Sequence, residues 1–227
     1  MSAVVPPPRH APGPLRVERL TRTEDGERLH ALLWRAGAGW RMISSAVLGG
    51  GLGAREWVLN AQVSHGYRRT DPDRHLAELA AAAGTGGGPG VGLMTAADVT
   101  AFGQGRDGGA DAVATAGLGV RGWAASPAEG GPAPAPPGTV NIVAVVPAAL
   151  TDAALVNAVA TATEAKVQAL LQAGYDCSGT PTDAVCVAAR VPHPGDEVHA
   201  FAGPRSLWGA RLARAVHTAV LTATPVP

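Results

Sequence analysis

The lysine at position 166 is the only lysine in a chain with seventeen arginines, and it falls in the segment 151–172, where apolar residues recur at helical spacing. At about 100° per residue, the pattern predicts Thr163 in the middle of the apolar stripe and Lys166 near its edge. A buried ammonium needs a partner, and a lysine can lose its proton, which an arginine cannot. We therefore expect chemistry on this helix; the alternative is a lysine that buries its stem and keeps its charged end in solvent. The stripe is predicted to contain Leu155, Val156, Val159, Val167, Leu170 and Leu171, with Asn157, Thr161, Glu164 and Gln168 opposite.

A second cluster of reactive side chains is the segment SGTPTD, which brings together Ser178, Thr180, Thr182 and Asp183. It directly precedes an apolar run that is typical of a buried strand. Loops at strand ends are favoured positions for reacting groups in α/β proteins. An ordinary polar turn accounts for the same residues equally well.

A glycine-rich segment, GGGLG, follows a predicted strand, but it matches neither the GxGxxG nor the GxxxxGK[ST] phosphate-binding pattern. It is expected to let the backbone approach a ligand or a neighbouring chain segment closely. Ser44, Ser45 and Asn60 flank this segment, and each taken alone is more often a turn or cap residue than a catalyst. The glycines concerned are Gly49, Gly50, Gly51 and Gly53.

Other residue types give weaker signals. His193 and His199 are six positions apart, which fits neither HExxH nor zinc-finger spacing, so no metal site is predicted. The two cysteines are too few for a disulfide framework, which favours a reduced, cytoplasmic protein. Trp40 and Trp57 could line a broad flat ligand site, although core packing is the commoner fate of tryptophan.

The composition limits the class of partner. A formal net charge of +0 with 16% charged residues gives no basic footprint for nucleic acid. No apolar run approaches the roughly 18 residues of a membrane span, and no secretory signal is apparent. We therefore expect a protein that binds a small molecule, with neither a nucleic acid nor a membrane as partner.

The elements that must position these residues can be outlined from periodicity and turn signals. The second half alternates strand, helix, strand, helix, which indicates a βαβ crossover with parallel pairing, whereas the first half is predicted to be antiparallel. The prediction is one α/β (mixed α+β) domain at 15–221, with one mixed sheet and about three main helices. Extended segments are expected at 15–21, 28–35, 40–48, 57–63, 91–97, 112–120, 139–146 and 183–191, helices at 71–83, 151–172 and 204–221, a surface loop at 126–138, a disordered Pro-rich lead at 1–14 and a disordered tail at 222–227.

Taken in order, several short blocks between Ile43 and Gly209 resemble those of the adenosylcobinamide amidohydrolase family. They are SSAVLGGG, WVLN, GLMTAADV, GTVNI, TATEAK, SGTPTDAV and FAGPRSLWG, the last with Ser206 where threonine is expected. The resemblance implies hydrolysis of the amide that joins a propionate side chain of the corrin ring to aminopropanol, giving adenosylcobyric acid in cobinamide salvage and cobamide remodelling. The corrinoid is then the substrate, and no cofactor is expected.

With this reaction in view, Lys166 and Glu164 are expected to lie near Ser178, Thr180 and Asp183. A deprotonated Lys166 would activate a serine or threonine hydroxyl. In the competing version, a carboxylate of Asp98, Glu164 or Asp183 activates water. Substrate-binding candidates are Ser44, Ser45, Gly49, Gly50, Gly51, Asn60, Thr95, Asn141, Thr163 and Thr182.

Two other functions fit the same residues. One is a non-catalytic corrinoid-binding protein, and the other is an amidase that acts on a different substrate. A homo-oligomer is compatible with each of them.

Overall fold

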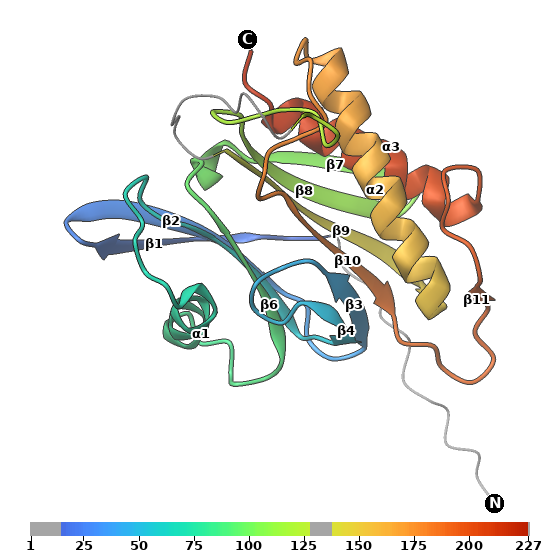
Figure 1. Ribbon diagram of the computed structural model, residues 1–227. Helices are drawn as coiled ribbons and strands as arrows, with labels where there is room; N and C mark the ends of the chain where they lie inside the picture. Colours follow the sequence, from blue (N-terminus) through green and yellow to red (C-terminus); the bar gives the residue numbers. More distant parts are fainter. Residues whose placement is uncertain (1–14, 128–137, 227) are drawn as a thin grey trace, which may run out of the picture.

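The computed structural model describes residues 15–127 and 138–226, and over these ranges the chain forms two β-sheets and three α-helices (Figure 1). The predicted lead at 1–14 lies outside the described residues, as do residues 128–137 of the predicted loop and residue 227. The mixed α/β class predicted from the sequence is confirmed.

The strands form two sheets, where the sequence pattern had predicted one mixed sheet. The strands are β1 (Glu18–Glu24), β2 (Glu27–Arg35), β3 (Trp40–Ser44), β4 (Gly51–Ala54), β5 (Trp57–Gln62), β6 (Gly90–Thr95), β7 (Gly103–Asp107), β8 (Ala110–Gly117), β9 (Thr139–Leu150), β10 (Ala184–Arg190) and β11 (Val198–His199). The smaller sheet has the order β1-β2-β5-β6, and the larger has the order β4-β3-β10-β9-β8-β7, with β11 paired to β9. In the larger sheet β9 and β10 are parallel, as the predicted crossover requires.

The helices are α1 (Pro72–Ala82), α2 (Asp152–Gln172) and α3 (Leu207–Ala223). Thr151 caps α2 by accepting from the N–H of Ala154, and Ser206 caps α3 through the N–H of Gly209. At its other end, α3 continues past the expected position 221. Residues 222 and 223 are therefore helical and do not belong to a tail.

These elements stack in four layers: α1, the smaller sheet, the larger sheet, and the pair of α2 and α3 (Figure 1). Leu33, Leu59 and Leu76 pack between α1 and the smaller sheet. Met42 and Val143 belong to the core between the two sheets. Because β5 is covered on both faces, all of its residues but the last are buried. Such a strand has no alternation, so its sequence could not reveal which sheet it joins.

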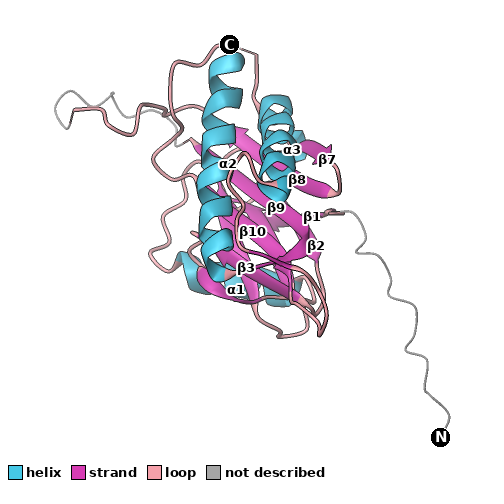
Figure 2. Ribbon diagram, turned by 90° about the vertical axis from the view of Figure 1, so that its right-hand side faces the viewer, coloured by secondary structure: helices cyan, strands magenta, loops and turns pink. Residues whose placement is uncertain are grey.

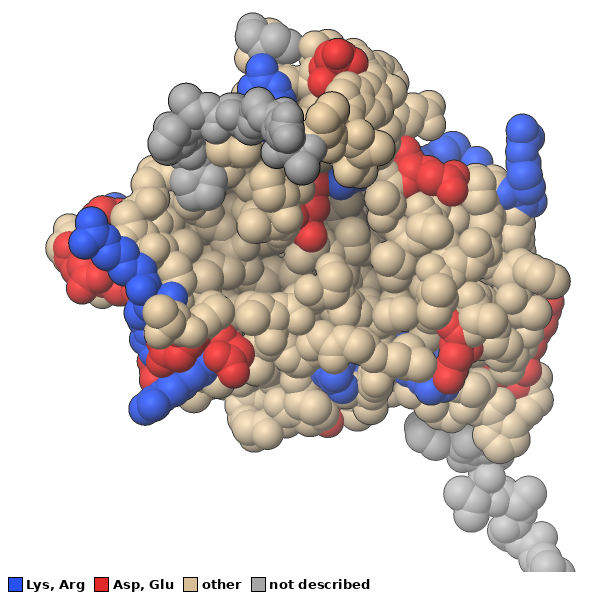
Figure 3. Space-filling view, viewed as in Figure 1, with Lys and Arg blue, Asp and Glu red and all other residues tan. Residues whose placement is uncertain are grey.

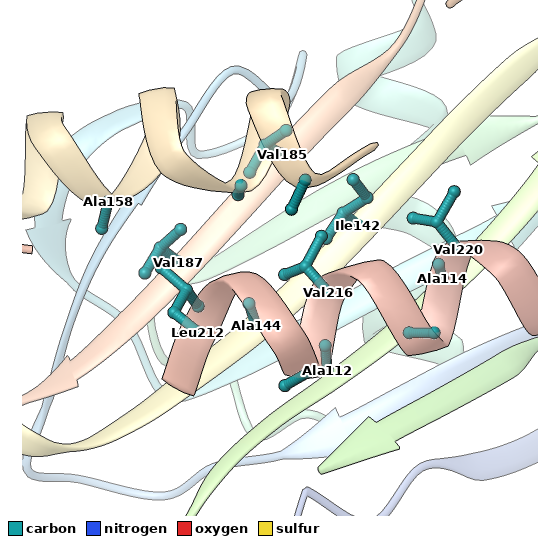
Figure 4. Close-up of a cluster of buried hydrophobic side chains, with 14 of the residues drawn as sticks. Ala112, Ala114, Ile142, Ala144, Ala158, Val185, Val187, Leu212, Val216 and Val220 are labelled. Carbon is teal, nitrogen blue, oxygen red and sulfur yellow. The ribbon is translucent and has the colours of Figure 1, made fainter. Parts of the chain in front are cut away.

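Small side chains build the core below α2 and α3, which lie side by side over the larger sheet (Figure 2). Figure 4 shows Ala158 of α2 near Val187 of β10, and Leu212 and Val216 of α3 over the same sheet. Alanine lets helix and sheet approach closely at high packing density. The buried face of α2 consists of Ala154, Leu155, Ala158, Thr161, Ala162, Ala165, Lys166, Ala169 and Leu170.

The predicted orientation of α2 is therefore partly wrong. Val156 and Leu171 are exposed, and Thr163 is exposed as well, although the pattern placed it in the middle of the buried stripe. Thr161, predicted on the polar side, is buried and donates to the carbonyl of Ala202 at 2.8 Å. The reason is that α3 and the sheet lie against the alanines, whose weak hydrophobic signal was outweighed by valine and leucine.

Candidate active site

The Lys166 side chain reaches from α2 to the segment that precedes β10. Its Nζ atom lies 2.5 Å from Oδ2 of Asp183, and the two side chains are only 9% and 12% exposed. The carboxylate balances the charge of an ammonium that is largely removed from water. The alternative prediction, a lysine with its charged end in solvent, is therefore wrong.

Asp183 is the centre of the polar cluster. Its Oδ1 accepts from the N–H of Val140 at 2.8 Å and from the hydroxyl of Thr180 at 2.5 Å. Its Oδ2 accepts from Lys166 and from the N–H of Thr180, the latter at 3.2 Å. A carboxylate offers about four lone-pair positions, so these donors occupy them all. Asp183 is therefore suited to hold Lys166 in place rather than to take a proton from water.

Two of the three hydroxyls of the SGTPTD segment, those of Ser178 and Thr180, are also hydrogen-bonded within the protein. Thr180 Oγ1 lies within reach of both Asp183 and the carbonyl of Gly138, the latter at 2.8 Å, and its single proton can serve one of them at a time. Ser178 Oγ accepts from the N–H of Ala124 at 2.8 Å and donates to the carbonyl of Gly122 at 3.3 Å. Both hydroxyls thus have acceptors for their protons before any substrate binds.

Gly179 makes this arrangement possible. Its φ of +151° is a conformation that residues with a side chain rarely adopt. A Cβ atom at this position would lie 2.2 Å from Oδ2 of Asp183 and 2.5 Å from Nζ of Lys166. Only glycine leaves room for the ion pair at this turn.

The ion pair forms one wall of an open cleft of about 810 Å³. The segment 120–127, which follows β8 and includes Trp123, lines the same cleft, and its Gly122 pairs with Gly179 beside the ion pair. Thr163 and Val167 of α2 complete the lining. On the face of the molecule drawn in Figure 3, the surface is hollowed toward the middle, where uncharged residues predominate. Most of the described residues that line the cleft are uncharged, so it offers a large ligand much apolar surface and few charges.

The cluster lies at the amino ends of the parallel strands β9 and β10. Asp183 immediately precedes β10, and the N–H of Val140 near the start of β9 binds its carboxylate. Thr182, a predicted binding residue, lies beside them and donates to the carbonyl of Gly138 at 3.0 Å. It also contacts the hydroxyl of Thr139 at 2.6 Å. Its hydroxyl thus anchors the start of β9.

Two predicted carboxylates are not part of this cluster. Glu164 is exposed on α2 and is not among the described residues that line the cleft. Asp98 caps a short 3₁₀ helix by accepting from the N–H and the hydroxyl of Thr100, at 2.8 and 2.9 Å. Of the three carboxylates considered for activating water, the structure brings only Asp183 to Lys166.

Asn60 and Asn141, two predicted binding residues, are buried between the sheets, where Asn141 Nδ2 donates to Asn60 Oδ1 at 2.8 Å. Asn60 in turn donates to Thr115 Oγ1 at 3.0 Å. Thr95 is buried on β6, and its hydroxyl accepts from the N–H of Ala97 at 3.0 Å. The two asparagines connect the sheets, Thr95 makes a local turn contact, and none of the three is among the described residues that line the cleft.

The serines and glycines of the glycine-rich segment have structural contacts too. Ser44 donates to the carbonyl of Val185 at 3.0 Å, and Ser45 accepts from the N–H of the same residue at 3.1 Å. A Cβ atom at Gly49 would meet the carbonyl oxygen of Gly90 at 1.9 Å. One at Gly50 would meet the carbonyl oxygen of Ala46 at 2.4 Å, whereas Gly51 has nothing nearby. At Gly49 and Gly50 the close approach is to neighbouring backbone.

Trp40 and Trp57 are buried in the core, the commoner fate of tryptophan, and neither lines this cleft. Trp123 lines it instead, and this residue was not predicted because residues 121–127 have no periodic pattern. The available signal was a tryptophan among glycine, alanine and proline, where no core is expected. Cys177, next to Ser178, is not a free nucleophile, because burial raises the pKa of its thiol.

Within residues 15–127 and 138–226, no group of three or more His, Cys, Asp or Glu side chains is arranged to hold a metal ion. Nor does any helix in those ranges have the length and apolar character needed to cross a bilayer.

A mixed α/β fold whose cleft combines a lysine, a carboxylate and hydroxyls has the groups that an amide-cleaving hydrolase uses, and comparison with known proteins agrees with this class. The family model described as adenosylcobinamide amidohydrolase matches residues 16–225. The chain therefore belongs to the adenosylcobinamide amidohydrolase family and is a hydrolase that acts on an amide.

Two relatives carry the name adenosylcobinamide amidohydrolase. The protein from Methanosarcina mazei is 35% identical over 144 residues, which are 63% of this chain and 67% of that protein. The protein from Halobacterium salinarum is 48% identical over 87 residues, 38% of this chain but only 36% of the relative's length. Among solved structures, the crystal structure of the PH0078 protein from Pyrococcus horikoshii OT3 has a TM-score of 0.47 and 14% identity, covering 91% of this chain and 83% of that one.

Proposed function

We propose that this protein hydrolyses the amide of adenosylcobinamide to adenosylcobyric acid and aminopropanol, in cobinamide salvage and cobamide remodelling. The names of its relatives support adenosylcobinamide as the substrate, and membership of the family supports cleavage of an amide bond. The observation that carries the proposal is the buried Lys166–Asp183 pair on the wall of a large, mostly uncharged cleft. The corrinoid is the substrate, the reaction uses no cofactor, and the protein works in the cytoplasm.

In this proposal Lys166 handles the proton that amide hydrolysis must deliver to the leaving amine. An ammonium has three N–H donors, of which one binds Asp183. Another donates to the carbonyl oxygen of the substrate and stabilises the negative charge that develops there. Lys166 then gives a proton to the leaving nitrogen as the C–N bond breaks, and it regains one from the water whose oxygen joins the carbonyl carbon.

Water is the preferred nucleophile because the hydroxyls of Ser178 and Thr180 already donate within the protein. Asp183 is the partner that keeps Lys166 charged and oriented. The alternative is that Lys166 activates a hydroxyl. It predicts an acyl group on Ser178 or Thr180, which the test below can detect.

The test is product analysis by mass spectrometry after incubation with adenosylcobinamide. Wild-type protein should release aminopropanol, and Lys166→Arg should lower kcat by at least about 10²-fold, because arginine keeps the charge but does not transfer protons. Arg74→Lys, an exposed basic exchange on α1, is the matched control and should retain activity.

Three outcomes would contradict parts of the proposal. Tight binding without aminopropanol release would indicate a non-catalytic corrinoid-binding protein. Turnover of other amides but not of this one would indicate an amidase with a different substrate. Full activity of Lys166→Arg would show that Lys166 is not the proton donor.

A further inference from the structure

Trp123 is the exposed tryptophan of the cleft. Its side chain is 44% exposed, whereas Trp34, Trp40 and Trp57 are at most 7% exposed. Trp208 is half-buried and stacks with Arg211 at 4.8 Å. Covering this indole with an apolar ligand would remove its surface from water, which is favourable. Trp123 lines the same cleft as Lys166, which indicates what that ligand is.

The backbone on both sides of Trp123 is fixed to the SGTPTD segment. On one side, Gly122 donates its N–H to the carbonyl of Gly179 and accepts from the N–H of Ser178, both at 3.0 Å. On the other side, the N–H of Ala124 donates to Ser178 Oγ at 2.8 Å. Ser178 is therefore the side chain that ties the Trp123 segment to the polar cluster.

We propose that Trp123 is the platform on which the large flat ring of the substrate rests, and that Ser178 is the positioning residue that holds it there. This inference rests on the proposed function and adds the residue that selects a ring-bearing amide over a simple one. An indole offers a wide rigid face at low entropic cost, and stacking on such a face is worth about 10-fold or more in affinity.

The geometry agrees with two separate roles within the cleft. The buried charges, Lys166 and Asp183, lie where the reacting amide must bind. The indole belongs to the neighbouring segment of the same lining, where an apolar ring is accommodated without desolvating a charge. The amide in question is carried on a side chain of the ring, so the two parts of the substrate can reach both groups at once.

Trp123→Ala should raise KM for adenosylcobinamide about 10-fold or more and leave kcat within about twofold. Trp123→Phe should retain most of the affinity. Phe201→Ala is the control, since Phe201 is an exposed aromatic residue, 74% exposed, that does not line the cleft. The propionyl amide of aminopropanol has the same scissile bond but no ring, and its kcat/KM should be the same in wild type and Trp123→Ala.

Ser178→Ala should also raise KM for adenosylcobinamide. The KM of the double variant should be little higher than that of Trp123→Ala alone, because the two residues work as one unit. Binding is measured separately with adenosylcobinamide and the Lys166→Arg variant, in which turnover does not consume the ligand. Combining Lys166→Arg with Trp123→Ala should raise the Kd by a similar factor. Circular dichroism and urea unfolding show whether each variant is folded.

Three results would overturn the inference. The first is a Trp123→Ala variant whose Kd and KM equal those of Phe201→Ala. The second is loss of kcat in Ser178→Ala at unchanged KM, which would make Ser178 the nucleophile. The third is an equal loss of kcat/KM on the ringless amide. If wild-type protein releases no aminopropanol, the proposed function fails, while the Kd comparison with adenosylcobinamide still tests Trp123.

Discussion

At the scale of single residues, the proposed chemistry depends on how Asp183 holds Lys166. A buried ammonium is tolerated here because a carboxylate lies against it and because backbone N–H groups and a hydroxyl fix that carboxylate. The same contacts remove Asp183 as a free base and leave Lys166 with donors for a substrate. In the proposed mechanism, the ion pair orients Lys166 as the proton donor.

Gly179→Ala should displace the Lys166–Asp183 ion pair without unfolding the protein. The added Cβ would overlap Asp183 Oδ2 and Lys166 Nζ, so the pair must shift by an ångström or more. A misplacement of that size costs about 10²-fold in rate, so kcat/KM should fall by about that factor.

Gly26→Ala is the control for the backbone strain of this change. Gly26 also has a positive φ, but nothing lies within 4 Å of a Cβ placed there. Its variant should lose a little stability in urea unfolding and keep wild-type kcat/KM. Equal kinetic losses in the two variants would show that the ion pair does not need its present geometry.

At the scale of elements, α2 positions the lysine through its alanine face. Ala158 and Ala162 are fully buried against α3 and the larger sheet, while Val156 and Leu171 are exposed. The helix is therefore turned relative to the orientation that the larger apolar residues predicted. This turn is what brings Lys166 to Asp183 and leaves Glu164 exposed.

Ala158→Leu should destabilise the protein by about 1–3 kcal/mol, because a closely packed core has no room for the larger side chain. Ala160→Leu is the matched control, since Ala160 is exposed on the same helix. Its free energy of unfolding should change by less than about 0.5 kcal/mol. Urea denaturation measures both, and similar stabilities would mean that α2 is not packed as described.

At the scale of the whole molecule, the two sheets share a buried polar contact as well as an apolar core. Asn60 of the smaller sheet accepts from Asn141 of the larger sheet and donates to Thr115. Asn141 Oδ1 is itself buried without a hydrogen-bond partner among the described residues. A polar contact of this kind fixes how the two sheets are aligned, and its loss leaves buried groups unpaired.

Asn60→Ala should lower the free energy of unfolding by about 1–3 kcal/mol, because it leaves Asn141 and Thr115 short of a partner. In a double-mutant cycle, Asn60→Ala and Asn141→Ala should show a coupling of about 0.5–3 kcal/mol. Asn60→Ala combined with Ala158→Leu, on the other face of the larger sheet, should be additive within about 0.5 kcal/mol. Unchanged stability together with lost substrate binding would instead show that Asn60 contacts the substrate.

The sequence by itself determined the α/β class, the crossover from β9 through α2 to β10, and the three helices, because these depend on local periodicity and capping. It also singled out Lys166, Thr180 and Asp183, since a lone lysine and a dense polar turn are visible as residue types. The blocks that resemble the amidohydrolase family were visible for the same reason.

Only the tertiary structure decided the division into two sheets, the orientation of α2 and the exposure of Trp123. Strands covered on both faces have no alternation, so β5 does not reveal its neighbours. Alanine gives little hydrophobic signal, so the buried face of α2 is set by what packs on it. The contact between Ser178 and the Trp123 segment joins residues more than fifty positions apart, and such a contact depends on how the layers stack rather than on any local pattern.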